Sequence, residues 1–280
     1  MEDSVQEKTE EDRKGGYVIK NIKMLLQYDG TRYDGWQKQR NTGNTIQGKM
    51  EQVLQRMTGK EVEVHGSGRT DAGVHAAGQV ANAHLDTELS PEEIRDYLNK
   101  YLPEDILVME TEEVPDRFHS RLNATEKIYT YHVDTAKKSV VFERKYLYTL
   151  GQKLDVEAMK KAAENLCGTH DFKSFCTGKN GKKSTVRTIK GIQIRKYGTI
   201  VEMRFRGDGF LYNMVRILAG TLMEVGMGKR TPESMEQILE ARDRQQAGFT
   251  APAKGLILTA VFYGGEETAK EAKRNQEGKI

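Results

Sequence analysis

The run GSGRTDAGVHA, residues 66–76, combines small residues with two residues that could do chemistry. Its three glycines permit positive φ angles and close backbone approach, and among them stand Arg69 and Asp71. An Asp on a loop of small residues is reachable by a bulky substrate, and a nearby guanidinium favours its ionised form. Because ionised carboxylates serve as nucleophiles and bases, the run indicates a catalytic aspartate. The alternative is an Asx-turn in a glycine-rich connection.

Aromatic and basic residues are interleaved in YDGTRYDGWQKQ, residues 28–39. Aromatic rings among Arg and Lys side chains suit stacking on nucleobases and pairing with phosphates. The alternative is a turn whose aromatic residues pack inward, and we expect Trp36, the only tryptophan of the chain, to lie in the core.

Two further stretches contain candidate site residues. Period-two alternation in a strand predicted over 128–133 places Tyr129 and Tyr131 on one side, where a ring either stacks on a base or fills a core. Arg216 lies in the middle of a strongly apolar helix predicted over 210–225, so its charge needs a partner. We expect Asp71 to be that partner, with a structural ion pair to another acid as the alternative.

The elements that must position these residues are predicted to alternate between strands and helices. Ser90-Pro91-Glu92-Glu93 starts a helix with a capping box, and Thr45, Asp155 and Thr231-Pro232 mark other helix starts. Further strands are predicted over 22–28, 61–65, 79–85, 106–112, 189–195, 199–205 and 255–263. This order indicates an α+β protein with two mixed α/β halves, antiparallel-rich sheets and a central cleft between them. We place the halves at 17–120, carrying Asp71, and 121–265.

Composition excludes several classes of protein. The chain of 280 residues is 37% hydrophobic, and it lacks the apolar run of roughly 20 residues that spans a bilayer. Two cysteines are too few for a disulfide scaffold, and no histidine spacing indicates a metal site. The start of the sequence shows no hydrophobic leader, so we expect a soluble, cytoplasmic protein.

The net charge of +3 is unevenly distributed along the chain. Residues 1–16 form an acidic tail with a net charge of −3. Residues 266–280 form a tail that is rich in charged residues but has a net charge of zero, and we expect both tails to be mobile. The body, 17–265, therefore carries an excess of six positive charges. This excess permits an anionic partner without identifying one.

Taken together, these strings resemble the tRNA pseudouridine synthase A (TruA) family over about residues 20–264. GRTDAGVHA is the most specific of them, and the closing GLILTAV supports the match by its position. The resemblance implies a pseudouridine-synthase fold and a homodimer that works on tRNA without cofactor or metal. It also implies isomerisation of uridine to pseudouridine at positions 38 to 40 of the anticodon stem-loop.

The resemblance further implies a role for each site residue. Asp71 matches the catalytic aspartate, Tyr129 the tyrosine that stacks on the flipped uracil, and Arg216 the basic residue that pairs with the aspartate. Arg69 matches an arginine that is associated with tRNA binding and with displacement of the base. Two positions depart from the family pattern, since Tyr33 stands where Phe is commoner and Ile128 replaces the usual basic residue before the tyrosine.

Two questions remain open from the sequence alone. Attack by Asp71 at C1′ of the ribose and at C6 of the base are both compatible with the sequence. The alternative function is a non-catalytic RNA-binding protein on the same scaffold, and a purely charge-driven RNA-binding protein is disfavoured because the body is only weakly basic.

Overall fold

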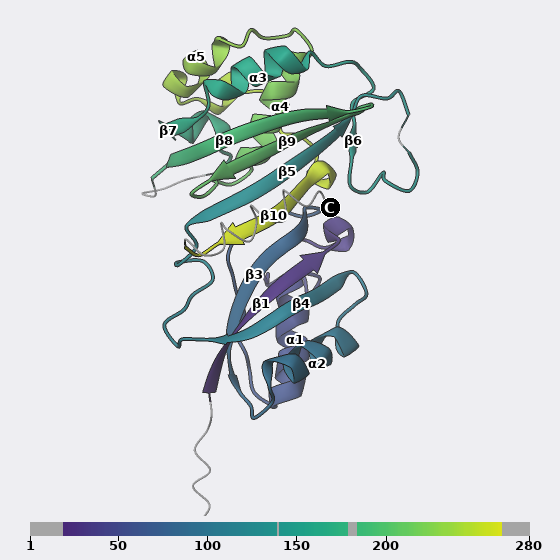
Figure 1. Cartoon of the computed structure of the whole chain (residues 1–280), viewed down its shortest axis with the longest axis vertical. Helices are drawn as coiled ribbons and strands as arrows, with labels where there is room; N and C mark the ends of the chain where they lie inside the picture. The colour runs from purple at the N-terminus through teal and green to yellow at the C-terminus, as the bar shows by residue number, and fades with distance from the viewer. Residues whose placement is uncertain (1–18, 139, 179–183, 265–280) are drawn as a thin grey trace, which may run out of the picture.

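One mixed β-sheet runs the length of the molecule, with helices packed against it (Figure 1). The computed structural model describes residues 19–138, 140–178 and 184–264, and within them the sheet has ten strands. Its order is β4-β1-β3-β10-β5-β9-β8-β7, with β2 paired to β3 and β6 paired to β5. The two tails predicted to be mobile, 1–16 and 266–280, lie outside the described residues.

The described strands and helices have the following bounds. The strands are β1 (Ile19–Tyr28), β2 (His65–Gly66), β3 (His75–Asp86), β4 (Ile106–Val114), β5 (Glu126–Asp134), β6 (Tyr148–Thr149), β7 (Gly168–Asp171), β8 (Val186–Tyr197), β9 (Ile200–Gly207) and β10 (Leu256–Phe262). The α-helices are α1 (Ile46–Thr58), α2 (Pro91–Tyr101), α3 (Val156–Glu164), α4 (Met214–Gly226) and α5 (Ser234–Ala241).

Local sequence determines most of the helix starts. The Thr45 side chain accepts a hydrogen bond from the Gly48 amide at the start of α1, and the capping box predicted at Ser90 is formed at the start of α2. The Asp155 side chain caps α3 in the same way. Three cap predictions are therefore confirmed.

Three element predictions were wrong in detail. The strand predicted over 61–65 is reduced to the two residues of β2, because the Val64 amide donates to the Glu51 side chain instead of to a strand. Helix α4 begins at Met214 and not at residue 210, since Asn213 adopts a left-handed conformation with φ 61°. Helix α5 begins at Ser234 without a side-chain cap, so Thr231 does not cap it.

Strand β10 joins the strands of the two predicted halves into a single sheet. It pairs in parallel with β3, where Leu258 faces Ala76, and antiparallel with β5, where Leu258 faces Tyr129. Gly78 permits this approach, because a Cβ at that position would lie 2.4 Å from the Thr259 carbonyl oxygen. The α+β class is confirmed, but the two halves share one sheet. The boundary at residue 120 stays a prediction.

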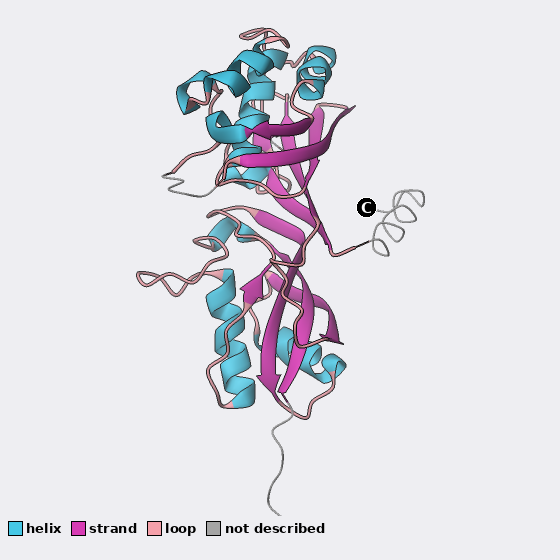
Figure 2. Ribbon diagram, turned by 90° about the vertical axis from the view of Figure 1, so that its left-hand side faces the viewer, coloured by secondary structure: helices cyan, strands magenta, loops and turns pink. Residues whose placement is uncertain are grey.

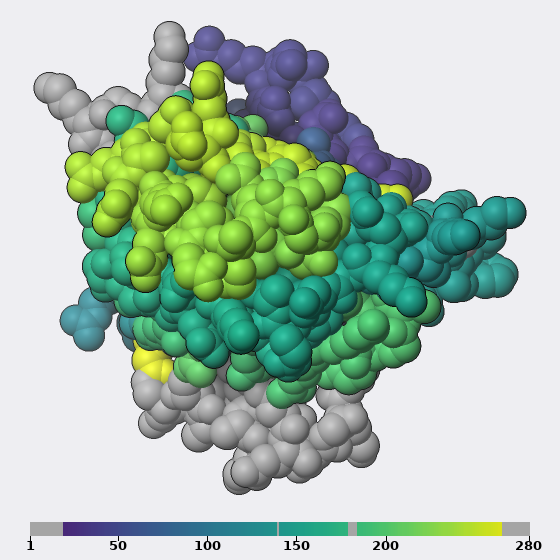
Figure 3. Space-filling view, turned by 90° about the horizontal axis from the view of Figure 1, so that it is seen from above, coloured from purple at the N-terminus to yellow at the C-terminus, as the bar shows by residue number. Residues whose placement is uncertain are grey.

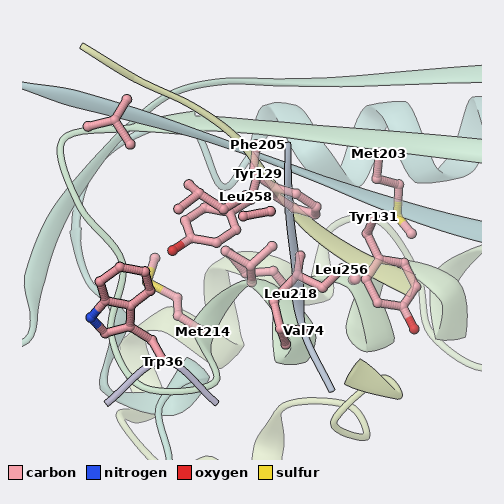
Figure 4. Packing of buried hydrophobic residues seen from close by; sticks show 14 of the residues in the cluster. Trp36, Val74, Tyr129, Tyr131, Met203, Phe205, Met214, Leu218, Leu256 and Leu258 are labelled. Carbon is pink, nitrogen blue, oxygen red and sulfur yellow. The ribbon is translucent and has the colours of Figure 1, made fainter. Parts of the chain in front are cut away.

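Helices cover one side of the sheet in the upper part of the molecule (Figure 2). Seen from above, α5 and α3 cover this end of the protein (Figure 3). The most apolar helix, α4, packs on β5, and its residues Met214 and Leu218 are fully buried. Figure 4 shows these two side chains in one cluster with residues from both predicted halves, among them Trp36 and Leu258. None of the described helices has both the length and the apolar character needed to cross a membrane.

Candidate active site

The aromatic turn after β1 supports the loop that carries Asp71. The Trp36 amide donates to the Thr70 carbonyl at 3.0 Å, and the Gly73 amide donates to the Tyr33 carbonyl at 3.3 Å. The Tyr28 hydroxyl and Thr70 Oγ1 lie 2.8 Å apart. All three aromatic rings of the turn are buried, and Trp36 is only 2% exposed. They therefore pack inward, as the alternative interpretation required, and do not present faces to a nucleobase.

The other end of the loop is fixed by β3. The Ser67 amide donates to the Val80 carbonyl at 2.8 Å, and Gln79 Nε2 donates to the Gly68 carbonyl at 2.8 Å. The Val74 amide closes a turn by donating to the Asp71 carbonyl at 3.1 Å. Because both ends of the loop are hydrogen-bonded to neighbouring elements, the backbone of Asp71 is held in place.

Asp71 and Arg216 form the ion pair that the sequence predicted. Arg216 Nη1 lies 3.3 Å from Asp71 Oδ2, and the two side chains are 18% and 19% exposed. The guanidinium is oriented by two further bonds, from Nε to the Ala251 carbonyl at 2.7 Å and from Nη1 to Asn213 Oδ1 at 2.9 Å. These two bonds orient the guanidinium so that it presents one edge to the carboxylate.

Two opposing effects act on the Asp71 carboxyl. Burial raises its pKa, whereas the charge and the hydrogen bond of Arg216 lower it, and the net pKa lies above the usual range. Arg69, two residues away, is exposed and makes no side-chain hydrogen bond or ion pair within the described part of the chain. The guanidinium that favours ionised Asp71 is therefore that of Arg216 and not of Arg69.

Tyr129 lies on β5 at the edge of the same site. Its ring is 7% exposed and packs edge-on against Phe210, with 5.3 Å between the ring centroids. Burial raises the pKa of its hydroxyl, and the nearby Tyr28 and Asp71 raise it further. In Figure 4 the Tyr129 hydroxyl is turned towards Trp36, whereas the hydroxyl of the fully buried Tyr131 points away. Tyr131 is therefore a core residue, and Tyr129 is positioned near Asp71.

Lys127 is a site residue that the sequence reasoning missed. Its Nζ donates to the Ser67 carbonyl at 2.5 Å, next to the loop that carries Asp71. Burial lowers the pKa of Lys127 to about 8, and the positive charges of Arg121 and Arg187 add to this effect. The signal that could have found it is the strand period, because residues 127 and 129 lie on the same face of β5.

A cavity of about 660 Å³ is lined by residues that include Tyr28, Asp29, His75 and Tyr146. Asp71 is not among its lining residues, so the predicted central cleft at Asp71 stays a prediction. In the ranges that the structure describes, no group of three or more His, Cys, Asp or Glu side chains is placed to hold a metal ion.

Comparison with known proteins identifies the family. A family model described as tRNA pseudouridine synthase matches residues 24–123 and 162–264, which is more than half of the chain. The chain belongs to the tRNA pseudouridine synthase family. It is 49% identical over 245 residues to tRNA pseudouridine synthase A of Bacillus sp. (strain KSM-64), covering 88% of this chain and 100% of that protein. It is 45% identical over 247 residues to tRNA pseudouridine synthase A 2 of Clostridium tetani, with the same two coverages.

The segments that match the family model contain some of the site residues but not all of them. Arg69, Asp71 and Arg216 lie within the two segments that match the pseudouridine synthase model, whereas Lys127 and Tyr129 lie between them. Among solved structures, a chain of a Cbf5-Nop10-Gar1 complex aligns with 87% of this chain and 51% of its own length, at 12% identity and a TM-score of 0.36. This likeness is too weak to add to the family assignment.

Proposed function

We propose that this chain isomerises uridine to pseudouridine in tRNA, at positions 38 to 40 of the anticodon stem-loop, with Asp71 as the nucleophile. Membership of the tRNA pseudouridine synthase family supports the reaction and the substrate class. The observation that carries the assignment of Asp71 is its ion pair with Arg216 on a loop anchored at both ends. An orienting cation beside a half-buried carboxylate is what a single-nucleophile mechanism needs.

The target base must first leave the RNA stack. Extruding a stacked base costs roughly a few kcal/mol. The enzyme recovers this energy through contacts with the flipped nucleotide and through side chains that fill the vacated space in the stem. Arg69 is exposed and without side-chain partners in the described residues, so it is free to enter the stem. Tyr129, close to Asp71, stacks on the extruded uracil.

The chemistry then requires one carboxylate and no net redox change. The ionised Asp71 attacks either C1′ of the ribose or C6 of the base, and the C1′–N1 glycosidic bond breaks. The uracil turns, a bond forms between C5 and C1′, and the carboxylate leaves. The proton on C5 is lost and N1 gains one, so substrate and product have the same composition. Arg216 stabilises the anionic carboxylate at the start and at the end of this sequence.

Three further parts of the proposal rest on the resemblance and the sequence. The protein acts as a homodimer, it works without a metal or cofactor, and it is located in the cytoplasm. A non-catalytic RNA-binding role on the same scaffold is less well supported, because binding phosphates does not require a half-buried acid paired with Arg216.

Replacement of Asp71 by Asn tests the proposal. We expect D71N to form no pseudouridine in the anticodon arm while its affinity for tRNA stays nearly unchanged, because the variant retains shape and loses only the nucleophile. Pseudouridine is mapped by mass-tagging after incubation of purified protein with tRNA. The matched control is D96N, which alters an exposed acid on α2. Normal modification by D71N would end the assignment, and no modification by the unaltered protein would end the proposed activity.

A further inference from the structure

Lys127 is a half-buried cation without an acidic partner among the residues that the structure describes. Within them its Nζ makes one hydrogen bond, to the Ser67 carbonyl, although an ammonium group has three donors. Within the described part of the chain no carboxylate forms an ion pair with it. The adjacent acid, Glu126, is already paired with Lys190 at 2.7 Å and with Arg206 at 2.5 Å. Two donors of a partly desolvated charge therefore remain for a ligand.

Two more cations lie near Lys127. Arg121 and Arg187 both lower its pKa through their charges, and neither forms an ion pair with an acid of the described residues. Arg187 Nη1 donates only to backbone carbonyls, those of Ser184 and Val186. Like charges gathered without acids repel one another, and an anion bound among them would remove this repulsion.

Lys127 and Tyr129 bring two polar groups together beside Gly68. A Cβ at Gly68 would lie 3.4 Å from the Tyr129 hydroxyl oxygen and 3.5 Å from Lys127 Nζ. Both polar groups therefore border Gly68, and the Tyr129 hydroxyl has no hydrogen-bond partner among the described residues.

We propose that Lys127, together with Arg121 and Arg187, binds a phosphodiester group of the substrate RNA at the edge of the site beside Gly68 and Asp71. This inference rests on the proposed function, since it names the part of the tRNA that this edge of the site binds. Lys and Arg side chains are among the groups that contact phosphates in nucleic-acid complexes, and such contacts fix the register of the bound strand. Lys127 is thus a positioning residue that holds the backbone of the extruded nucleotide while Asp71 meets its sugar or base.

Equilibrium binding of full-length tRNA tests the inference, measured over a series of salt concentrations in a D71N background to prevent turnover. We expect K127M to weaken binding by about tenfold or more. It should also reduce the slope of log affinity against log salt by about one. K127R should retain both, because a guanidinium also binds phosphate. The control is K160M, because Lys160 lies on α3 and is paired with Glu157.

The pH dependence of binding provides a second measurement. The groups that face Lys127 are Arg121, Arg187 and Tyr129, with Asp71 further along the loop, and burial lowers the pKa of Lys127 to about 8. Because the free ammonium loses its proton there, affinity should fall as pH rises through about 8. With K127R the fall should disappear, since arginine stays protonated.

G68A supplies a variant that leaves the cations in place. The added methyl group makes only ordinary contacts in the free protein, so the fold should persist while the methyl crowds Lys127 Nζ and the Tyr129 hydroxyl and weakens binding. An unchanged salt slope for K127M in the D71N background would overturn the phosphate role. Tight binding there, together with slow turnover by the K127M single variant, would also overturn it and would assign Lys127 to proton transfer. If the unaltered protein binds tRNA without modifying it, the proposed function fails while the salt slope still decides the role of Lys127.

Discussion

Arg216 Nη1 lies 3.3 Å from Asp71 Oδ2, although the two residues are 145 positions apart in the chain. One belongs to a glycine-rich loop before β3, and the other to the first turn of the apolar helix α4. Burial raises the pKa of Asp71 and Arg216 lowers it, so the fraction of ionised nucleophile at a given pH depends on this contact as well as on burial.

Replacement of Arg216 by Met should move the acidic limb of the pH–activity profile to higher pH. Without the cation, the burial that raises the pKa of Asp71 is unopposed, so the carboxylate forms only at higher pH and activity is lost first on the acid side. We expect a displacement of about one pH unit or more in kcat/KM. R216K is the matched variant, because it keeps the charge and loses the bond geometry to Ala251 and Asn213. An identical profile for R216M would show that the pair does not control the nucleophile.

Replacement of Tyr129 separates the ring from the hydroxyl. The free energy of unfolding of Y129F should lie within about 0.5 kcal/mol of that of the unaltered protein, because the hydroxyl has no hydrogen-bond partner among the described residues. Y129A removes a ring packed on Phe210 and should lower the free energy of unfolding by about 3 kcal/mol. We expect Y129F to retain more pseudouridine formation than Y129A at a temperature where both are folded, since stacking needs the ring. Equal losses of activity would assign the hydroxyl an acid or base role.

Replacement of Gly78 by Ala tests the junction between β3 and β10. The added Cβ would lie 2.4 Å from the Thr259 carbonyl oxygen, a backbone atom that cannot move alone, so we expect a loss of about 1–3 kcal/mol in the free energy of unfolding. The control is G191A on β8, where no atom lies within 4 Å of the added Cβ. Denaturant unfolding measures both variants. Equal free energies of unfolding for G78A and G191A would mean that β3 and β10 can move apart at Gly78 without loss of stability.

The sequence predicts a flexible basic loop that contains Lys182 and Lys183 and could bind RNA phosphates. Both residues lie outside the described residues. We predict that replacing them by Ala weakens tRNA binding and reduces its salt dependence, independently of Lys127.

Local signals predicted much of the secondary structure because they act over a few residues. Thr45, Ser90 and Asp155 cap their helices through bonds that span three residues. The same reasoning failed at 61–65, where a long-range bond from Val64 to Glu51 replaces strand pairing. It also placed the start of α4 too early, since the left-handed conformation of Asn213 depends on its surroundings in the folded chain.

The sequence by itself determined the residue types of the site and its most distinctive loop, GSGRTDAGVHA, and it indicated that a charge buried in α4 must meet an acid. It also indicated that Trp36 lies in the core, but only the tertiary structure decided that Trp36 supports the loop that carries Asp71. Likewise, only the structure shows that Lys127 faces the site with no acidic partner among the described residues. It also decided that β10 enters between β3 and β5 and unites the two sets of strands. The physical reason is that burial and pairing between distant segments depend on which surfaces meet, and composition and periodicity describe each segment alone.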